Sequence, residues 1–168
     1  LVLVCDVFII IGAVQVWHKV KQSLPDADYE VRIIGQQWAW VFQHPGQDGA
    51  LDTDDDIFTT DDLYVENDRT YHFKLTSRDV LHDFSVPVFR LKQDAVPGRM
   101  NETWSRAGKE GIYYGQCSEL CGTDHGFMPM AIEVVSKERF KQWVGEAKQK
   151  FASDTAAPAT QVAEIGRA

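Results

Sequence analysis

The chain has 168 residues, which is enough for one domain of ordinary size with a hydrophobic core and short appendages. Its formal net charge of -8 argues against a nucleic-acid partner, because a phosphate backbone binds basic surfaces, and it favours a basic protein partner. An odd count of three cysteines argues against a complete disulfide framework.

Residues 1–17 are almost continuously apolar and predict a helix about 26 Å long, slightly short of a typical hydrocarbon core. An interfacial Trp17 follows, with Lys19 and Lys21 placed to snorkel. Neither an initiating Met nor a basic leader precedes the run, so we expect residues 1–21 to be the end of a transmembrane helix. A buried core helix is the alternative. By the positive-inside rule the two lysines weakly favour a cytoplasmic exit, which conflicts with the periplasmic or outer placement that the family resemblance implies below.

Residues 27–135 read as the main domain, and this domain is mostly β. Short runs rich in Val, Ile, Thr and aromatic residues alternate with turn signals such as HPGQDG and PGR. Many short strands at this spacing predict an all-β sandwich or Greek-key barrel. A helix is expected over residues 136–151, with Ser136 as its N-cap and an apolar face that includes Trp143. Residues 152–168 are small and polar, which is typical of a flexible tail.

Residues 113–130 read YYGQCSELCGTDHGFMPM and contain a cluster of soft metal ligands. Cys117, Cys121, His125 and Met128 all lie within 12 residues. Thiolate, imidazole and thioether together favour copper, and a weak axial Met is typical of copper sites that transfer electrons. Zinc takes thiolate and imidazole readily but rarely thioether, and remains an alternative.

The second cysteine has no place in a one-copper site, which needs one Cys, two His and a weak axial ligand. Two bridging thiolates hold two coppers instead, and the second copper then needs another histidine. Among the remaining histidines, His82 lies between two predicted strands, where a loop can direct it at the site. A disulfide between Cys117 and Cys121, with His125 as a bystander, is the competing interpretation, and Met128 as core filler is another.

At these residues the chain resembles subunit II of haem–copper cytochrome c oxidases. The resemblance rests on CSELCGTDHGFM, on DVLH upstream, on KQDAVPGRMNETW between them and on GQQWAW at residues 35–40, and it runs to about residue 151. It implies a cupredoxin-like Greek-key barrel or sandwich with an N-terminal transmembrane helix and a short C-terminal helix. Family members usually have two membrane helices, and Gln36 stands where the family usually has His.

The resemblance also implies a dinuclear copper-A centre in which Cys117 and Cys121 bridge two coppers. His82 and His125 would each supply a nitrogen, Met128 would be the axial ligand of one copper, and the backbone carbonyl of Glu119 that of the other. The Glu119 side chain would point toward a magnesium or manganese ion shared with the catalytic subunit. A solvated loop acid is the alternative for Glu119.

Trp38 matches the tryptophan through which cytochrome c delivers its electron in this family. Core packing is the alternative, and Trp40 shares its parity on a strand, so alternation cannot separate the two. Asp79 matches an acidic docking position of the family. Residues 48–62 contain seven Asp and no Lys or Arg, so residues 54–56 (Asp54, Asp55 and Asp56) are further candidates to steer a basic cytochrome. A solvated loop that aids solubility is the alternative for this run, whereas an EF-hand is rejected because the required Gly and Glu are missing.

The function that follows is electron entry into a proton-translocating oxidase. The chain itself would transfer electrons only, from cytochrome c to a haem of subunit I, and would assemble with other oxidase subunits in the bacterial plasma membrane or the mitochondrial inner membrane, with the copper domain on the periplasmic or outer side. A quinol-oxidase subunit is disfavoured because such subunits lack the copper ligands. Nitrous-oxide reductase is disfavoured because its copper domain follows a long propeller. A soluble copper carrier is disfavoured by the membrane helix and the acidic run.

Overall fold

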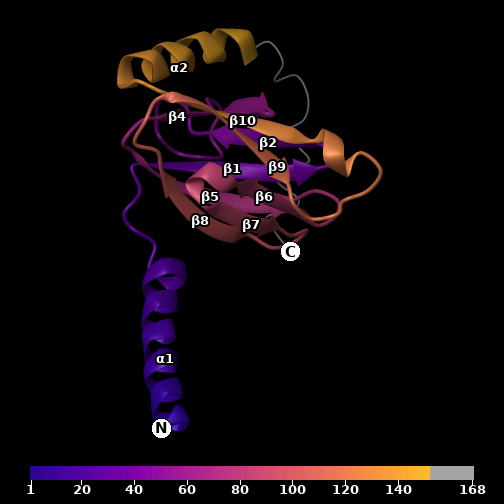
Figure 1. The fold of residues 1–168 in the computed structure, drawn as a ribbon. Coiled ribbons are helices and arrows are strands. Elements are labelled where there is room, and N and C mark those ends of the chain that lie inside the picture. Colours follow the sequence, from indigo (N-terminus) through magenta and orange to yellow (C-terminus); the bar gives the residue numbers. More distant parts are fainter. Residues whose placement is uncertain (152–168) are drawn as a thin grey trace.

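Two five-stranded sheets pack face to face in this computed structural model, which describes residues 1–151 (Figure 1). The first sheet has the order β3-β2-β1-β5-β8, and the second has the order β4-β10-β9-β6-β7. The strands are β1 (Tyr29–Gln36), β2 (Ala39–His44), β3 (Ile57–Thr60), β4 (Asp62–Glu66), β5 (Thr70–Ser77), β6 (His82–Val86), β7 (Leu91–Ala95), β8 (Asn101–Arg106), β9 (Gly111–Cys117) and β10 (Pro129–Val135). The prediction of an all-β sandwich flanked by two helices is confirmed.

The core lies between the two sheets and is built by the inward-facing residues, which alternate with outward-facing ones along many of the strands. Trp40, Phe42 and Phe84 are fully buried there, and Phe84 meets both of the other rings edge-on at centroid distances of 5.4 and 6.2 Å. Edge-to-face pairs of this kind add to the free energy gained by burying the rings. β1 lies in the middle of its sheet, antiparallel to β2 and parallel to β5.

The apolar helix α1 (Val2–Trp17) continues through one wider turn, η1 (His18–Gln22), and stands apart from the sandwich (Figure 1). Val2–Gln22 forms a 21-residue helix with a mean hydropathy of 1.7, and none of its most apolar window is buried. It is long and apolar enough to cross a membrane. The alternative of a buried core helix is therefore wrong for these residues.

The second helix, α2 (Lys137–Phe151), packs across β3 and β4 on the side of the sandwich away from α1 (Figure 1). Ser136 caps it, since its Oγ accepts a hydrogen bond of 3.2 Å from the backbone N–H of Arg139. Trp143 is its main anchor and stacks on Tyr64 with the ring centroids 4.6 Å apart. Trp143 also covers the buried His44 ring. The predicted tail, residues 152–168, lies outside the described residues.

Candidate metal centre

Two neighbouring strands of the second sheet, β6 and β9, bring the predicted ligands together at one end of the sandwich. β6 begins at His82 and β9 ends at Cys117, and the antiparallel pairing of Phe84 with Cys117 places these ends side by side. The donor atoms of His82, Cys117 and Cys121 lie within 4.8 Å of one another, and all three residues are buried. The sandwich therefore assembles the centre from segments that are 35 residues apart in the chain.

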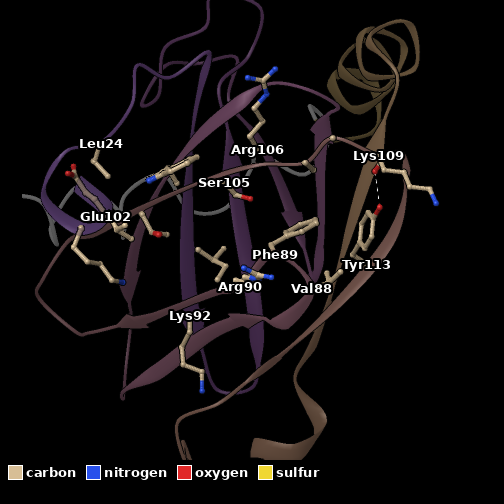
Figure 2. A pocket seen from close by; sticks show the side chains of 17 residues that line it. Leu24, Val88, Phe89, Arg90, Lys92, Glu102, Ser105, Arg106, Lys109 and Tyr113 are labelled. Atoms are coloured by element: carbon tan, nitrogen blue, oxygen red, sulfur yellow. Dashed lines mark hydrogen bonds between the residues drawn. The ribbon is translucent and has the colours of Figure 1, made fainter. Parts of the chain in front are cut away.

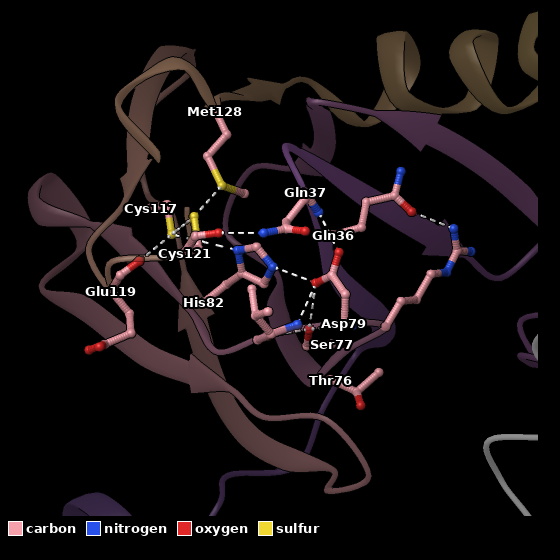
Figure 3. A network of polar contacts seen from close by, with 12 residues as sticks. Gln36, Gln37, Thr76, Ser77, Asp79, His82, Cys117, Glu119, Cys121 and Met128 are labelled. Carbon is pink, nitrogen blue, oxygen red and sulfur yellow. Dashed lines mark hydrogen bonds and ion pairs between the residues drawn. The ribbon is translucent and has the colours of Figure 1, made fainter. Parts of the chain in front are cut away.

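The Cys117 sulfur has two donor atoms close to it. Its Sγ lies 3.9 Å from Nδ1 of His82 and 3.3 Å from the backbone carbonyl oxygen of Glu119. Figure 3 shows this carbonyl turned toward the sulfur, while the Glu119 carboxylate points away from the cluster. One imidazole nitrogen and one carbonyl thus share the Cys117 side of the site.

The Cys121 sulfur is paired with a different set. Its Sγ lies 3.5 Å from Nδ1 of His125 and 3.3 Å from Sδ of Met128, which is fully buried. The short turn η3 (His125–Phe127) leads the chain back from the cluster into β10, and Met128 lies between the two. The second imidazole and the thioether thus share the Cys121 side.

The two sulfurs are 3.8 Å apart, whereas a disulfide needs about 2.05 Å, and both cysteines are free. Burial, together with the neighbouring Cys117, raises the pKa of Cys121 to about 11. A thiol in such surroundings keeps its proton at neutral pH unless a cation displaces it. The structure therefore presents a pair of thiols and not the disulfide of the competing interpretation.

Asp79 supports the His82 ring from behind. Its Oδ1 accepts a hydrogen bond of 2.9 Å from Nε2 of His82, and its Oδ2 accepts one of 2.7 Å from the backbone N–H of Gln37 (Figure 3). Burial alone would raise the pKa of Asp79, but the hydrogen bonds from His82, Gln37 and Val80 lower it below its usual value. A carboxylate accepts only, so the proton of a neutral imidazole is held on Nε2 and the lone pair on Nδ1 faces Cys117.

Asp79 is predicted from the sequence as a partner-docking residue, and its contact with His82 was not expected. The hydrogen bond joins residues three apart in a loop, and no periodic pattern reports it. The Asp79 side chain keeps 31% of its surface exposed, so the contact with His82 leaves room for the docking role that was predicted.

Gln37 ties the turn between β1 and β2 to the metal loop. Its Nε2 donates a hydrogen bond of 2.8 Å to the backbone carbonyl of Cys121, across 84 residues of chain. Next to it, the half-buried Trp38 ring lies over Gly122, where a Cβ would come within 3.2 Å of the ring. Gly122 has a φ of +125°, which glycine adopts readily. Trp40, by contrast, is fully buried in the core.

The acidic run lies at the other end of β2 from Trp38. Asp52 forms a salt bridge of 2.6 Å with Arg32, and Asp56 accepts a short hydrogen bond from Gln43, both of which lie toward that far end. β2 has six residues, which corresponds to about 20 Å. Asp55 accepts a hydrogen bond from the backbone of Gln47, and Asp54 is exposed.

The donor set fits copper better than zinc. Two thiols, two imidazole nitrogens, a thioether and a carbonyl oxygen converge on one buried volume. Zinc closes its shell with four thiolate or imidazole ligands and leaves no place for a thioether. Soft sulfur with imidazole is the combination that copper prefers, and the doubled thiol allows two metal ions to share ligands.

Comparison with known proteins gives one consistent result. The family model described as the periplasmic domain of cytochrome c oxidase subunit II matches residues 29–135. The chain is 43% identical over 146 residues to a probable cytochrome c oxidase subunit 2 of Rickettsia bellii, and the aligned region covers 79% of this chain and 54% of that protein. It is 34% identical over 158 residues to cytochrome c oxidase subunit 2 of Cereibacter sphaeroides, covering 76% of this chain and 52% of that protein.

Two solved structures are similar as well. The periplasmic domain of subunit II of cytochrome oxidase from Bradyrhizobium japonicum aligns with a TM-score of 0.69 at 38% identity, over 77% of this chain and 99% of that one. A mixed-disulfide intermediate between a thioredoxin-like protein and subunit II of cytochrome c oxidase aligns with a TM-score of 0.66 at 40% identity, over 77% and 98%. The chain spans about half the length of the curated relatives it matches.

Proposed function

The chain belongs to the cytochrome c oxidase subunit II family, and from this we propose that it is the electron-entry subunit of such an oxidase. It accepts electrons one at a time from cytochrome c at a dinuclear copper centre and passes them to a haem of the catalytic subunit. Oxygen reduction and proton pumping then belong to that partner.

The observation that carries this proposal is the doubled sulfur in a buried site with two imidazoles. Cys117 and Cys121 are close enough to share two metal ions, and each has its own imidazole nitrogen nearby. Two coppers held this way supply a one-electron store whose charge is spread over both metals. His82, Cys117, Cys121 and Met128 are buried, and the contact between Asp79 and His82 holds one ligand in place.

Metal content tests the centre directly. We expect the full chain, loaded with copper in detergent, to hold two coppers with a paramagnetic resonance spectrum delocalised over both. Cys117→Ser should abolish that spectrum, whereas Cys5→Ser is the matched control, since Cys5 is exposed on α1 far from the site. One copper per wild-type chain, or a localised single-copper signal, contradicts the proposal.

Trp38 is the proposed point of electron entry. Its ring lies against Gly122, directly after the ligand Cys121, so the side chain connects the surface with the metal loop. We expect Trp38→Leu to slow reduction by cytochrome c at unchanged copper content, while a small chemical reductant still reduces the centre. Trp104→Leu, on β8, is the matched control. Equal rates of reduction by cytochrome c in wild type and Trp38→Leu would remove Trp38 from the path.

Acidic side chains are proposed to orient the cytochrome. Asp79 is close to Trp38 through Gln37, whereas Asp54 and its neighbours lie at the far end of β2 and would act only through the long-range field. Added salt should therefore lower the rate of electron entry. Because Asp79 also holds the His82 ring, rates are compared per bound copper, and on that basis Asp79→Asn should lower the rate more than Asp54→Asn. A rate that does not respond to ionic strength would count against electrostatic docking.

The Glu119 carboxylate is proposed to reach a magnesium or manganese ion shared with the catalytic subunit. It is exposed and directed away from the sulfurs, so it is free to serve a second site. Replacing it with Gln keeps the backbone carbonyl and should therefore lower the manganese content of the assembled oxidase without changing its copper content. A loss of copper together with manganese would contradict this division of roles.

α1 is proposed to anchor the subunit in the bacterial plasma membrane, or in the mitochondrial inner membrane, with the sandwich on the periplasmic or outer side. The helix has the length and hydropathy that this requires. Alkaline carbonate washing of membranes should leave the chain in the pellet, and a protease added outside should reach the sandwich. Release of the chain into the carbonate wash would contradict anchoring.

A thioredoxin-like reductant is proposed as an assembly partner, because a relative has been captured in a mixed disulfide with such a protein. An oxidant such as molecular oxygen would take two electrons and two protons from Cys117 and Cys121 and leave a disulfide, and a dithiol partner would restore both thiols while becoming a disulfide itself. We expect the oxidised chain to bind no copper until such a dithiol has reduced the disulfide. Copper uptake by the fully oxidised chain would contradict the requirement.

A further inference from the structure

A groove of about 600 Å³ opens on the side of the sandwich that faces the end of α1 (Figure 2). Val20, Lys21 and Leu24 from the segment after α1 form one wall. The other walls come from the short turn η2 (Pro87–Phe89) with β7 and from β8 with the start of β9. The copper ligands contribute nothing to this groove, so it is a separate feature of the molecule.

The charge of the groove is opposite to that of the whole chain. Five bases and a single acid line it, in a protein whose net charge is -8. The bases come from three separate segments and are Lys21, Arg90, Lys92, Arg106 and Lys109. The acid is Glu102. Positive charge is thus concentrated where the chain passes from helix to sandwich.

These bases are largely unneutralised within residues 1–151. No ion pair joins Arg90, Lys92 or Lys109 to a described carboxylate within 4.0 Å, and Arg106 reaches Asp68 only at 3.9 Å. Figure 2 shows Arg90, Lys92, Arg106 and Lys109 placed around the groove. Lys92 attracts Asp83 and Arg106 attracts Asp28 over a longer range, but a ligand that carries negative charge would not have to break an ion pair of Arg90, Lys92 or Lys109.

Apolar and aromatic groups share the groove with the bases. Val88 is 59% exposed and Trp104 is 38% exposed, and the rings of Phe89 and Tyr113 meet at 5.0 Å. Bases beside Trp, Tyr and an aliphatic rim are the combination that proteins place at the headgroup level of a membrane. A free anion such as phosphate would use the bases but not this rim.

We propose that the groove binds the phosphate-bearing headgroup of an anionic phospholipid from the leaflet that α1 leaves. The proposal rests on the membrane anchoring proposed above, because the segment that follows α1, here called the tether (residues 20–24), forms one wall of the groove. The phosphate lies beside Arg90, and Lys92 and Lys109, which lie on either side of Arg90 in Figure 2, add to the positive field around it, while the glycerol and first acyl carbons contact Val88 and Trp104. The lipid then joins tether and sandwich, which limits rotation of the sandwich about the anchor.

The test uses the full chain in neutral detergent, titrated with phosphatidylglycerol or phosphatidylcholine and analysed by native mass spectrometry. Each base near a membrane surface is worth about a fivefold change in affinity, which corresponds to about 1 kcal/mol. The triple variant Arg90→Ala, Lys92→Ala, Lys109→Ala should therefore bind phosphatidylglycerol about a hundredfold more weakly than wild type. All three side chains are exposed, so the variant should keep its fold.

The matched control removes the same charge from α2, on the opposite side of the sandwich, with Lys137→Ala, Arg139→Ala and Lys141→Ala. Phosphatidylglycerol binding should stay at the wild-type level in this control. Equal binding of the two lipids by wild type, or an equal loss in both triple variants, overturns the proposal. So does full competition by millimolar inorganic phosphate, which would identify a free anion as the ligand.

Copper content measured on the same samples separates this proposal from the proposed function. Neither triple variant alters a copper ligand, so both should load copper like wild type. A chain that binds copper without preferring the anionic lipid disproves the groove alone. A chain that prefers the lipid but takes no copper disproves the electron-entry centre alone.

Discussion

Gly35 offers the sharpest test of how the sandwich positions His82, a proposed copper ligand. An added Cβ at this position would lie 2.9 Å from Cδ2 and 3.1 Å from Cγ of His82. Ordinary carbon–carbon contacts are about 3.5–4.0 Å, so in Gly35→Ala the ring has to move by about half an ångström or more. His82 is fully buried, and the Trp40 ring lies edge-on at 5.9 Å, which leaves little room for that movement.

The magnitude follows from that geometry. Overpacking by one methyl typically costs about 1–3 kcal/mol of unfolding free energy. A metal ligand is expected to stay within about 0.2 Å of its proper distance, and disturbed ligand support typically lowers metal affinity by about 10- to 100-fold. Gly35→Ala should therefore remain folded, unfold at lower urea concentration and lose copper to a chelator far more readily than wild type.

Gly126→Ala is the matched control, because it lies in the metal loop itself and a Cβ there meets no heavy atom within 4 Å. Urea unfolding and chelator competition, followed by absorbance, measure both quantities on the two variants. Equal copper retention by Gly35→Ala and Gly126→Ala would refute the idea that close approach of β1 fixes the His82 ring.

Three further predictions concern the rest of the chain. Trp143→Ala removes the main anchor of α2 and should cost about 3–5 kcal/mol in urea unfolding, with copper retained, and a cost below about 1 kcal/mol would contradict the anchoring role. Burial lowers the pKa of His44 to about 3 from 6.5, so between these two pH values the unfolded chain binds a proton that the folded chain does not. The free energy of unfolding should therefore fall by up to about 1.4 kcal/mol per pH unit as the pH is lowered from about 6.5 toward 3. His44→Leu should flatten this dependence in unfolding curves taken across that range. Asp79→Asn should leave the fold intact but weaken copper retention by about 10- to 100-fold, because an amide is a poorer partner for Nε2 of His82, and retention equal to wild type would show that the contact is dispensable.

Much of the fold was readable from local patterns. Short β-rich runs between turn signals predicted the sandwich, and Ser136 predicted the start of α2. The relation between Trp38 and Trp40 was not readable, because alternation assumes one continuous strand. The structure breaks the chain between β1 and β2 at residues 37–38, so Trp40 enters the core while Trp38 lies over Gly122.

The contacts that sequence reasoning missed join distant segments. His44 precedes Pro45 in the sequence, where no local pattern predicts burial, but it ends β2 and is buried by Trp143, almost a hundred residues later. Gln37 reaches the carbonyl of Cys121 across 84 residues. The cluster of Cys117, Cys121, His125 and Met128 could be predicted as candidate ligands because spacing and donor chemistry are local properties. Their supports were not, because only the folded sandwich brings those residues together.

β1 has a mechanical consequence beyond its place in the sheet. It begins at Tyr29, next to the tether of α1, and ends at Gln36, next to the turn that carries Trp38. Its eight residues span about 26 Å, and hydrogen bonds to β2 and β5 stiffen it along its length. Because β1 runs across the direction of α1 (Figure 1), the end of the sandwich next to Trp38 is displaced sideways from the axis of α1. Any turn of β1 about its start at Tyr29 would therefore move the end that holds His82 and Trp38 further than the end next to α1.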